Sequence, residues 1–445
     1  MRSYRKVLLL VFFALLVSIT GCGLKQQNND KSPKPTDDED TNIPVLTPTQ
    51  TPESSPTPTE KAEQTRTEKW ISQTKDADKV ILSVEEIEKY NEKLIKKSSS
   101  LIDIINAPII YSKETITNYI NGGYIPTLPK YDKTGEVTNE DVANIKKNYN
   151  LEAIQSETKA QYGVVVYRAD LKSLPTKLGF YDSPSDKYYD RIQETELIVG
   201  MPLLVLHTSL DKEFVYIQSY FYRGWVKADA VAICDTKEAW LEFAEPKDFI
   251  TVISPLVPIG SKGAKADMGS YFPLVKENND SYTIKIPVRN QEGKLEVQET
   301  TISKKDAVKG YLPYTKGNYI TQAFKYLGTP YGWGGLDEGV DCSGFIISVF
   351  RTFGFKFPRN TSQQSGKISD IVINLEGLSK ETIQEELKKV DDPACLFKKG
   401  HVILYLGELD GVQYVIHAPQ GGEVVKEEPL TNVILNLVNA TVIKE

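Results

Sequence analysis

Histidine and cysteine are scarce in this chain of 445 residues, which has three His and four Cys. Four cysteines are too few for a small scaffold held together by disulfides. The imidazoles available for catalysis or metal binding are those of His207, His401 and His417. Positive charge is not in excess either, because 53 Lys and Arg stand against 60 Asp and Glu. This balance argues against nucleic acid as a partner.

The chain is too long for one ordinary domain and too apolar to be disordered throughout. Hydrophobic residues make up 40% of the sequence and aromatic residues 10%, which suffices for packed cores. A length of 445 residues predicts two to four domains.

The N-terminus has the pattern of an export signal. Three basic residues precede an apolar run of 13 residues, from Val7 to Ile19. This run is shorter than the ~20 residues that span a bilayer and matches the core of a signal peptide. It ends in Thr20-Gly21-Cys22, which resembles a bacterial lipobox, whose cysteine thiol takes a diacylglycerol. We therefore predict a lipoprotein signal peptide over residues 1–21 and lipidation at Cys22, with an uncleaved membrane anchor as the alternative.

A tether is predicted over residues 22–68. Seven prolines alternate there with Thr, Ser and acidic residues, and no hydrophobic periodicity is visible. Such a segment cannot bury enough apolar area to offset its ordering entropy. We expect a disordered, extended linker that reaches on the order of 100 Å from the membrane.

The middle of the chain reads as a helical segment followed by two small β modules. Apolar residues recur at helical spacing between Val84 and Ile105, after a capping box formed by Ser83 and Glu86. We assign residues 69–160 to this helical stabilising segment. Short β-type runs separated by turn signals then predict a small barrel over residues 161–235.

The first β module resembles a bacterial SH3-like domain of the kind that precedes cell-wall peptidases. The resemblance rests on five short blocks: Arg168-Ala169-Asp170-Leu171, Pro175-Thr176, Asp190-Arg191-Ile192-Gln193, Leu206-His207-Thr208-Ser209 and Arg223-Gly224-Trp225-Val226. Residues 236–310 look like a second, divergent copy. Because His207 lies within a β run, we interpret it as a structural histidine.

A cysteine stands where a glycine-rich loop meets an apolar helix. The loop is Tyr331-Gly332-Trp333-Gly334-Gly335, and Asp341-Cys342-Ser343-Gly344-Phe345 follows it. Apolar residues then recur at helical spacing up to Phe353, and Gly354 suits a C-cap. Cys342 is thus predicted at a helix N-terminus, where unpaired N–H groups favour the thiolate.

His401 is the candidate base for Cys342. It opens a strand-like run, and His417 closes a second run after the turn signal Asp410-Gly411. A hairpin that closes around Leu409-Asp410 places the two histidines opposite each other, with Cβ atoms ~5 Å apart. His417 could then fix the tautomer of His401, whose other nitrogen would face Cys342. This gives a nucleophile, a base and an orienting group.

Two other uses of these residues were considered. A zinc site would take Cys342, Cys395, His401 and His417, but no closely spaced ligand pair is present. We therefore predict no metal. In an exported protein, Cys234 and Cys395 could also form a disulfide.

The C-terminal pattern resembles the NlpC family of papain-like cell-wall peptidases over residues 317–420. Five blocks stand in the family's order: Pro330-Tyr331-Gly332-Trp333-Gly334-Gly335, Asp341-Cys342-Ser343-Gly344-Phe345, Pro358-Arg359-Asn360-Thr361-Ser362-Gln363-Gln364, Gly400-His401-Val402 and His417-Ala418. The resemblance implies a circularly permuted papain-like domain over residues 311–445. It also implies Cys342 as nucleophile, His401 as base and His417 as the third residue of the triad. The expected architecture is an α+β multidomain protein.

The resemblance also implies an activity and a location. The expected protein is a cell-surface cysteine peptidase that hydrolyses peptidoglycan stem peptides through a thioester, without a cofactor. The usual bond in this family joins γ-D-glutamate to a diamino acid. With Cys22 lipidated, the protein would be a monomer on the outer face of the membrane, within a Gram-positive wall.

Substrate-binding residues follow from the same resemblance. Asp341 and Ser343 would hold the free amine of an L-alanyl substrate, although Asp341 is also a candidate N-cap. Five further residues would line the pocket, two of them from the first SH3-like domain that leans over the cleft: Tyr331, Trp333, Thr361, Tyr222 and Asp190. Intact wall and trimmed L-alanyl peptides are both compatible with this set.

One feature departs from the family pattern. Members often carry a Pro-Gly-Asp turn before the catalytic histidine, whereas residues 366–399 form an insertion here. The alternatives to a peptidase are a wall-binding lipoprotein without activity, and an amidase or acyltransferase on the same fold.

Overall fold

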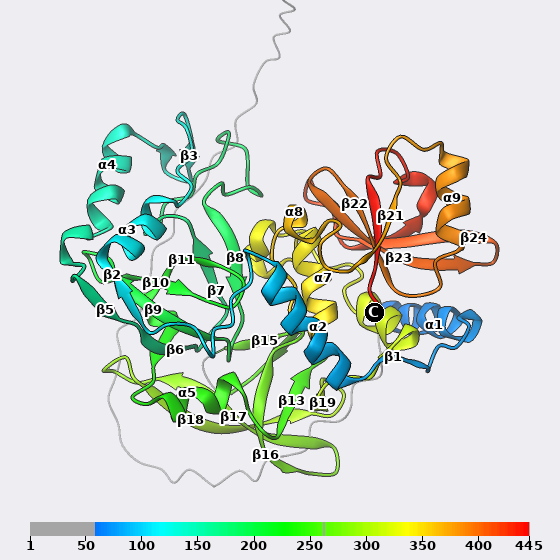
Figure 1. Cartoon of the computed structure of the whole chain (residues 1–445), viewed down its shortest axis with the longest axis horizontal. Coiled ribbons are helices and arrows are strands. Elements are labelled where there is room, and N and C mark those ends of the chain that lie inside the picture. Colours follow the sequence, from blue (N-terminus) through cyan, green and yellow to red (C-terminus); the bar gives the residue numbers. More distant parts are fainter. Residues whose placement is uncertain (1–57, 261–262, 445) are drawn as a thin grey trace, which may run out of the picture. The chain divides into compact units, whose positions relative to one another are not determined.

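The computed structural model describes residues 58–260 and 263–444 (Figure 1). The predicted signal peptide over residues 1–21, the lipidation site Cys22 and the tether up to residue 57 lie outside the described residues. None of the helices in the described part of the chain is long and apolar enough to span a membrane.

The first described element, α1 (Pro58–Gln73), corrects the predicted end of the tether at residue 68. Trp70 is buried and packs edge-on against Phe324 and Tyr414, and its Nε1–H donates to Glu427 at 2.8 Å. Arg66 donates two hydrogen bonds to the same carboxylate, at 2.9 and 2.7 Å. One buried indole and the ion pairs of Arg66 with Glu427 and of Lys69 with Asp410 therefore anchor α1, so the sequence shows no apolar periodicity there.

The predicted helical region is helical in pieces. Ser83 and Glu86 form the predicted capping box at the start of α2, which is confirmed, and this helix ends at Lys97. Leu101 and Ile105, which were counted in the helical pattern, lie in an irregular segment instead. The elements of the region, with α2 among them, are β1 (Val80–Leu82), α2 (Val84–Lys97), β2 (Ile110–Ser112), α3 (Lys113–Asn121), β3 (Tyr131–Asp132), β4 (Gly135–Glu136), α4 (Asn139–Asn148), η1 (Leu151–Ala153) and β5 (Glu157–Lys159).

The first β domain is one antiparallel sheet with the strand order β12-β6-β9-β10-β11-β7-β8. Its strands are β6 (Gln161–Val165), β7 (Ala169–Lys172), β8 (Gln193–Leu197), β9 (Pro202–Thr208), β10 (Phe214–Gln218), β11 (Arg223–Lys227) and β12 (Val231–Ile233), with η2 (Ala228–Ala230) before the last. His207 lies in β9 and its Nε2 contacts the carbonyl oxygen of Tyr149 at 3.0 Å. This position fits a structural histidine.

The second β domain follows α5 (Lys237–Ala244). Its main sheet has the order β18-β17-β16-β13-β19, and β14 pairs with β15. The strands are β13 (Phe249–Val252), β14 (Leu256–Pro258), β15 (Lys265–Asp267), β16 (Tyr271–Glu277), β17 (Ser281–Arg289), β18 (Leu295–Ser303) and β19 (Ala307–Lys309). Its assignment as a divergent SH3-like copy stays a prediction.

The C-terminal domain combines a six-stranded sheet, ordered β21-β26-β22-β23-β24-β25, with several helices, one of which begins at Cys342 (Figure 1). The strands are β20 (Tyr314–Thr315), which pairs with β1, and β21 (Ile371–Asn374), β22 (Ala394–Lys398), β23 (His401–Leu409), β24 (Val412–His417), β25 (Lys426–Pro429) and β26 (Asn439–Val442). The helices are α6 (Lys316–Phe324), η3 (Trp333–Glu338), α7 (Cys342–Arg351), α8 (Thr361–Gln364), α9 (Lys380–Lys388) and η4 (Leu430–Asn432).

The segment 366–399 is built into the sheet. It contains β21, α9 and β22, and β22 runs antiparallel to β23 with Lys398 opposite His401. The turn between the two strands is Lys399-Gly400, and Gly400 has φ +75°. A glycine at a positive φ thus replaces the Pro-Gly-Asp turn, and His401 still opens a buried strand.

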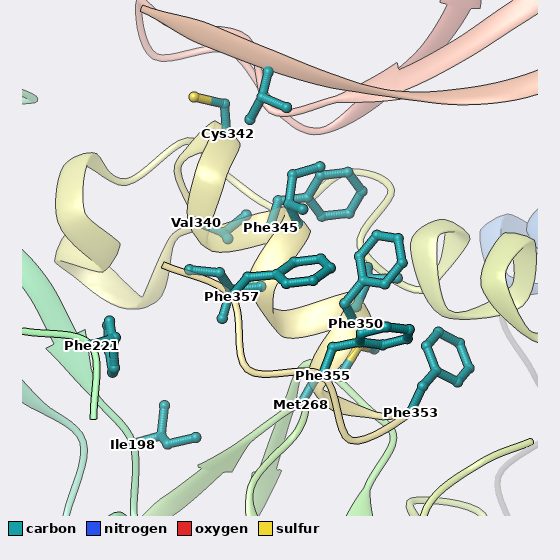
Figure 2. Close-up of a cluster of buried hydrophobic side chains, with 14 of the residues drawn as sticks. Ile198, Phe221, Met268, Val340, Cys342, Phe345, Phe350, Phe353, Phe355 and Phe357 are labelled. Atoms are coloured by element: carbon teal, nitrogen blue, oxygen red, sulfur yellow. The ribbon is translucent and has the colours of Figure 1, made fainter. Parts of the chain in front are cut away.

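A cluster of phenylalanines fixes α7 (Figure 2). Phe345 and Phe350 project from the helix, and the segment after it adds further rings, so that all of them are fully buried. Ile198 and Phe221 of the first β domain and Met268 of the second belong to the same core. Residues from three domains therefore hold the helix, and Cys342 sits at its N-terminal end (Figure 2).

Candidate active site

Cys342 is the first residue of α7, and Asp341 is its N-cap. The Oδ1 atom of Asp341 accepts a hydrogen bond from the backbone N–H of Gly344 at 2.7 Å. The Sγ atom of Cys342 lies 3.7 Å from the Oγ1 atom of Thr361, and 5% of the cysteine is exposed. The thiol is therefore placed by a capped helix and nearly covered.

The predicted lowering of the Cys342 pKa is wrong for this arrangement. Burial raises the pKa of the thiol to about 11, and the neighbouring Asp341 carboxylate adds to the shift. The N–H of Val402, the Thr361 hydroxyl and the Arg359 guanidinium favour the thiolate but only partly offset the burial. A helix N-terminus is worth less here than desolvation next to a negative charge.

His401 and His417 meet through a different register from the predicted one. Leu404 faces Ile416, a bulge follows around Leu406, and Leu409 faces Val412. Continuing the first pairing puts residue 403, and not His401, opposite His417. The two histidines are diagonal neighbours on one face, which still lets their rings meet. The Nε2 atom of His401 lies 2.8 Å from the Nδ1 atom of His417.

The hydrogen-bonded chain behind His401 continues to a carboxylate. The Nε2 atom of His417 lies 2.7 Å from the Oε1 atom of Glu428 in β25. The Nδ1 atom of His401 is buried and has no hydrogen-bond partner among the described residues. The backbone N–H of Val402, the next residue, is directed at the Cys342 thiol. His401, with its unpaired ring nitrogen, is therefore the first residue of the strand end that adjoins the thiol.

Both histidines are neutral in the resting site. Burial lowers the pKa of His401 to about 3, and the neighbouring His417 and Lys398 lower it further, while Asp341 opposes them. Burial also lowers the pKa of His417, although Glu428 acts in the opposite direction. The site at neutral pH therefore holds a thiol and an imidazole rather than a thiolate–imidazolium pair.

Asp341 has its acceptor sites occupied within the protein. Its two oxygens accept from the Nη1 and Nη2 atoms of Arg359, at 2.9 and 2.7 Å, and Oδ2 also accepts from the N–H of Gly334 at 2.9 Å. Burial alone would raise the pKa of Asp341, but Arg359 and the backbone N–H groups outweigh it and hold the pKa below its usual value. Ser343 accepts from Arg359 at 2.9 Å. Asp341 and Ser343 thus organise the loop, and their role in holding a substrate amine stays a prediction.

Arg359 also ties the active-site helix to the first β domain. Its side chain is 2% exposed, its Nε–H donates to Thr195 Oγ1 at 2.6 Å, and its Nη2 lies 3.5 Å from Glu196 Oε2. Thr195 and Glu196 lie in β8. Two carboxylates on one guanidinium make this a buried ion-pair network.

Of the two aromatic residues predicted for the pocket, Tyr331 lies near Cys342, and Trp333 contacts the first β domain. Tyr331 is buried, its hydroxyl has no hydrogen-bond partner among the described residues, and burial, Asp341 and Cys342 raise its pKa. Trp333 donates from Nε1 to the carbonyl oxygen of Gln193 at 3.2 Å. Tyr189 of the first β domain packs against both rings, at 6.1 and 5.7 Å between centroids.

Tyr222 lines a pocket of about 780 Å³ together with Glu194, Trp333 and Gln363. Its hydroxyl donates to the Oε2 atom of Glu194. Burial raises the pKa of Glu194, and the Tyr222 hydroxyl and Arg359 only partly offset it. The first β domain therefore presents a buried carboxylate to the space next to Trp333.

Asp190 lies in the interior of the first β domain, and its role as a substrate-binding residue stays a prediction. It is 1% exposed and accepts hydrogen bonds from Lys172 Nζ and from the N–H groups of Phe180 and Ile192, at 2.9, 2.9 and 3.2 Å. These partners all lie in the first β domain, so the carboxylate stabilises that domain.

The alternative uses of the cysteines find no support in the described residues. Cys234, Cys342 and Cys395 are free thiols there, so the Cys234–Cys395 disulfide does not form. Cys395 faces Leu404, three residues and ~10 Å along the strand from His401. Within the described part of the chain, no group of His, Cys, Asp and Glu is arranged to hold a metal ion.

The sequence-based site missed four residues: Tyr189, Glu194, Arg359 and Glu428. Arg359 stood inside a motif block, and a basic residue close to a buried helix could have suggested a partner for Asp341. Glu428 gave no local signal, because only the pairing of β24 with β25 brings it beside His417.

Two protein families match segments of the chain that lie in different domains of the fold. Residues 328–438 match the NlpC/P60 family, and residues 180–227 match the SH3 domain of the SH3b1 type. A solved NlpC/P60 endopeptidase from Photobacterium damselae subsp. piscicida is 24% identical and aligns with a TM-score of 0.67 over 82% of this chain and 94% of that chain. The predicted multidomain fold is thus confirmed, and the C-terminal domain is similar to the NlpC/P60 family over residues 328–438.

Similar proteins carry peptidase names. Dipeptidyl-peptidase 6 of Lysinibacillus sphaericus is 25% identical over 244 residues, which cover 53% of this chain and 83% of that protein. The γ-D-glutamyl-L-lysine dipeptidyl-peptidase of Bacillus subtilis strain 168 is 30% identical over 120 residues. That alignment covers 26% of this chain and 35% of the relative.

Proposed function

We propose that this protein is a cell-wall cysteine peptidase that hydrolyses peptidoglycan stem peptides between γ-D-glutamate and a diamino acid. One observation carries the proposal: a capped cysteine helix adjoins a strand whose first residue, His401, keeps a buried ring nitrogen without a partner. The NlpC/P60 match and the names of the relatives support the substrate class.

The reaction uses Cys342 as the nucleophile and His401 as the base. As Sγ attacks the amide carbonyl carbon, the thiol proton passes to Nδ1 of His401, and the backbone N–H of Cys342 stabilises the oxyanion. The imidazolium then protonates the leaving amine, and a thioester forms. Water, deprotonated by His401, hydrolyses the thioester and releases a carboxylic acid and the free thiol.

Because thiol and imidazole are both neutral at rest, proton transfer accompanies the attack. The thiol is nearly covered, and a bound substrate would complete the exclusion of water, so the developing charges form among fixed dipoles. The His417–Glu428 chain faces the imidazolium that forms and stabilises its positive charge.

Glu194 gives the pocket a preference for a free amino terminus. Its carboxylate is buried, and an ammonium group beside Trp333 and Tyr222 would supply the charge partner that it lacks. Asp341 is already paired with Arg359, so Glu194 is the better candidate for this contact. The proposed substrate is therefore a trimmed peptide that begins with L-alanyl-γ-D-glutamate.

This specificity is tested with L-Ala-γ-D-Glu-L-Lys and its N-acetylated form. The wild-type protein should cleave the free-amine peptide at least about tenfold more efficiently, since a charge-assisted hydrogen bond contributes ~1.5–3 kcal/mol. Glu194→Gln should raise KM for the free-amine peptide and leave the acetylated one nearly unchanged. Mass analysis of the products identifies the bond broken. Equal kcat/KM for both peptides in the wild-type protein would contradict the amine preference.

The site of action is proposed from the sequence of the N-terminus. A lipid on Cys22 would hold the enzyme on the outer face of the membrane, and the Pro-rich tether would let it reach the wall. Cys22→Ser should move the protein from the membrane fraction of producing cells to the medium, as measured by immunoblotting. Retention of the variant in the membrane fraction would contradict anchoring through this thiol.

A further inference from the structure

The proton chain behind His401 ends on Glu428, a residue outside the predicted triad. Its Oε1 atom faces Nε2 of His417 at 2.7 Å, and its Oε2 atom accepts from Nδ2 of Asn432 at 3.0 Å. The side chain is 16% exposed, whereas that of His417 is 5% exposed. A mostly covered carboxylate thus closes a line of three hydrogen-bonding groups.

An ionised carboxylate accepts hydrogen bonds and cannot donate them. The Nε2 atom of His417 must therefore carry a proton, and the Nδ1 atom of this neutral ring must be an acceptor. That acceptor requires a proton on Nε2 of His401, 2.8 Å away. A neutral His401 protonated at Nε2 has its lone pair on Nδ1, which is the buried ring nitrogen that has no partner among the described residues.

We propose that Glu428 is a positioning residue that fixes the tautomers of both histidines and so makes Nδ1 of His401 the proton acceptor. The inference deepens the proposed function, because the proton in question is that of Cys342. Without the carboxylate, the His417–His401 pair has two equivalent proton orders. In the reversed order Nδ1 of His401 carries a proton and cannot act as a base.

The charges around the chain keep Glu428 in its accepting form. Burial alone would raise its pKa, but Asn432, His417 and Lys426 outweigh it and hold the pKa below the usual value. The charged or titratable groups that act on the two imidazoles are Lys398 of β22, Lys426 and Glu428 of β25, and Asp341 before α7. At neutral pH the chain therefore ends on an anion.

The strand that carries Glu428 is held from its other face. Glu427 receives two hydrogen bonds from Arg66 and one from Trp70, so α1 fastens β25 one residue before Glu428. Successive side chains of a strand point to opposite faces. The contacts with α1 therefore lie on the face of β25 opposite to Glu428, whose own partners are His417 and Asn432.

The test is the histidine nitrogen NMR spectrum of the protein, in which three histidines give few signals. In the wild-type protein at neutral pH, His401 and His417 should both be protonated at Nε2. In Glu428→Gln the amide can donate as well as accept, so the spectrum should show a reversed or mixed tautomer at both rings. For L-Ala-γ-D-Glu-L-Lys we expect kcat to fall at least about tenfold with KM within about twofold.

Glu427→Gln is the matched control. It makes the same chemical change one residue away and loses charge at α1, but it should leave both tautomers and kcat nearly unchanged. A Glu428→Gln protein that folds and keeps the wild-type tautomers and kcat overturns the inference. If that variant does not fold, a proton on Nδ1 of His417 in the wild-type protein overturns it. A wild-type protein with the expected tautomers but no hydrolysis would instead contradict the proposed function alone.

Discussion

Replacing Cys342 with alanine should reduce hydrolysis of L-Ala-γ-D-Glu-L-Lys by on the order of 10⁴-fold or more. No thioester can form without the sulfur, and water alone would have to attack the amide. The loss should appear in kcat, since the substrate contacts proposed for Glu194, Tyr222 and Trp333 remain. Release of L-Ala-γ-D-Glu, followed by liquid chromatography and mass spectrometry, measures the effect.

Cys234→Ala is the control for this experiment, because Cys234 is a buried free thiol of the first β domain. It should retain the wild-type kcat. The urea midpoint of Cys342→Ala should lie close to that of the wild-type protein, which separates lost chemistry from lost structure. Equal turnover by Cys342→Ala and the wild-type protein would contradict the assignment of the nucleophile and leave a wall-binding role.

Cys342 could be singled out from the sequence as the candidate nucleophile because its signals are local. A glycine-rich loop, an N-cap and an apolar face at helical spacing lie within about 25 residues around Cys342. The desolvation of the thiol could not be predicted from the local sequence pattern, and the structure shows it. The phenylalanine cluster and Asp341 together raise the pKa that the helix N-terminus alone would lower.

In the hairpin of β23 and β24, the turn could be predicted from the sequence, but the pairing register of the strands could not. The turn signal was correct, since Asp410 and Gly411 have φ of +52° and +79°, as a two-residue hairpin turn requires. The bulge around Leu406 then shifts the pairing, and no local feature of the sequence announces it. His401 and His417 meet nonetheless, because diagonal positions on one face of a hairpin remain within reach of long side chains.

Glu194, Arg359 and Glu428 could not be found in this way. Each one acquires its role from a segment distant in the chain: Tyr222 for Glu194, Asp341 and Glu196 for Arg359, and His417 for Glu428. Acidic and basic residues are common on surfaces, so their types alone carry little information. Only the partners and the burial seen in the structure distinguish these three residues from ordinary surface charges.

Arg359→Met should destabilise the protein strongly, by ~3–5 kcal/mol, because it leaves the buried carboxylates of Asp341 and Glu196 without their cation. Methionine keeps much of the side-chain volume, so the loss reports the charge rather than a cavity. The N-cap of α7 should loosen at the same time, because Arg359 also fixes Asp341. The urea midpoint at neutral pH and kcat for L-Ala-γ-D-Glu-L-Lys measure the two effects.

The stabilisation that Arg359 provides through Asp341 should depend on pH. Arg359 lowers the pKa of Asp341 in the folded protein below its value in the unfolded chain, ~3.9. The stabilisation is therefore present above about pH 4 and is lost as the pH falls through the folded pKa. Arg191→Met is the matched control, since Arg191 pairs with the exposed Asp182 and should contribute less than ~1 kcal/mol. If both variants unfold at the same urea concentration, the buried network does not stabilise the active-site helix, and Asp341 must hold α7 through its backbone contacts alone.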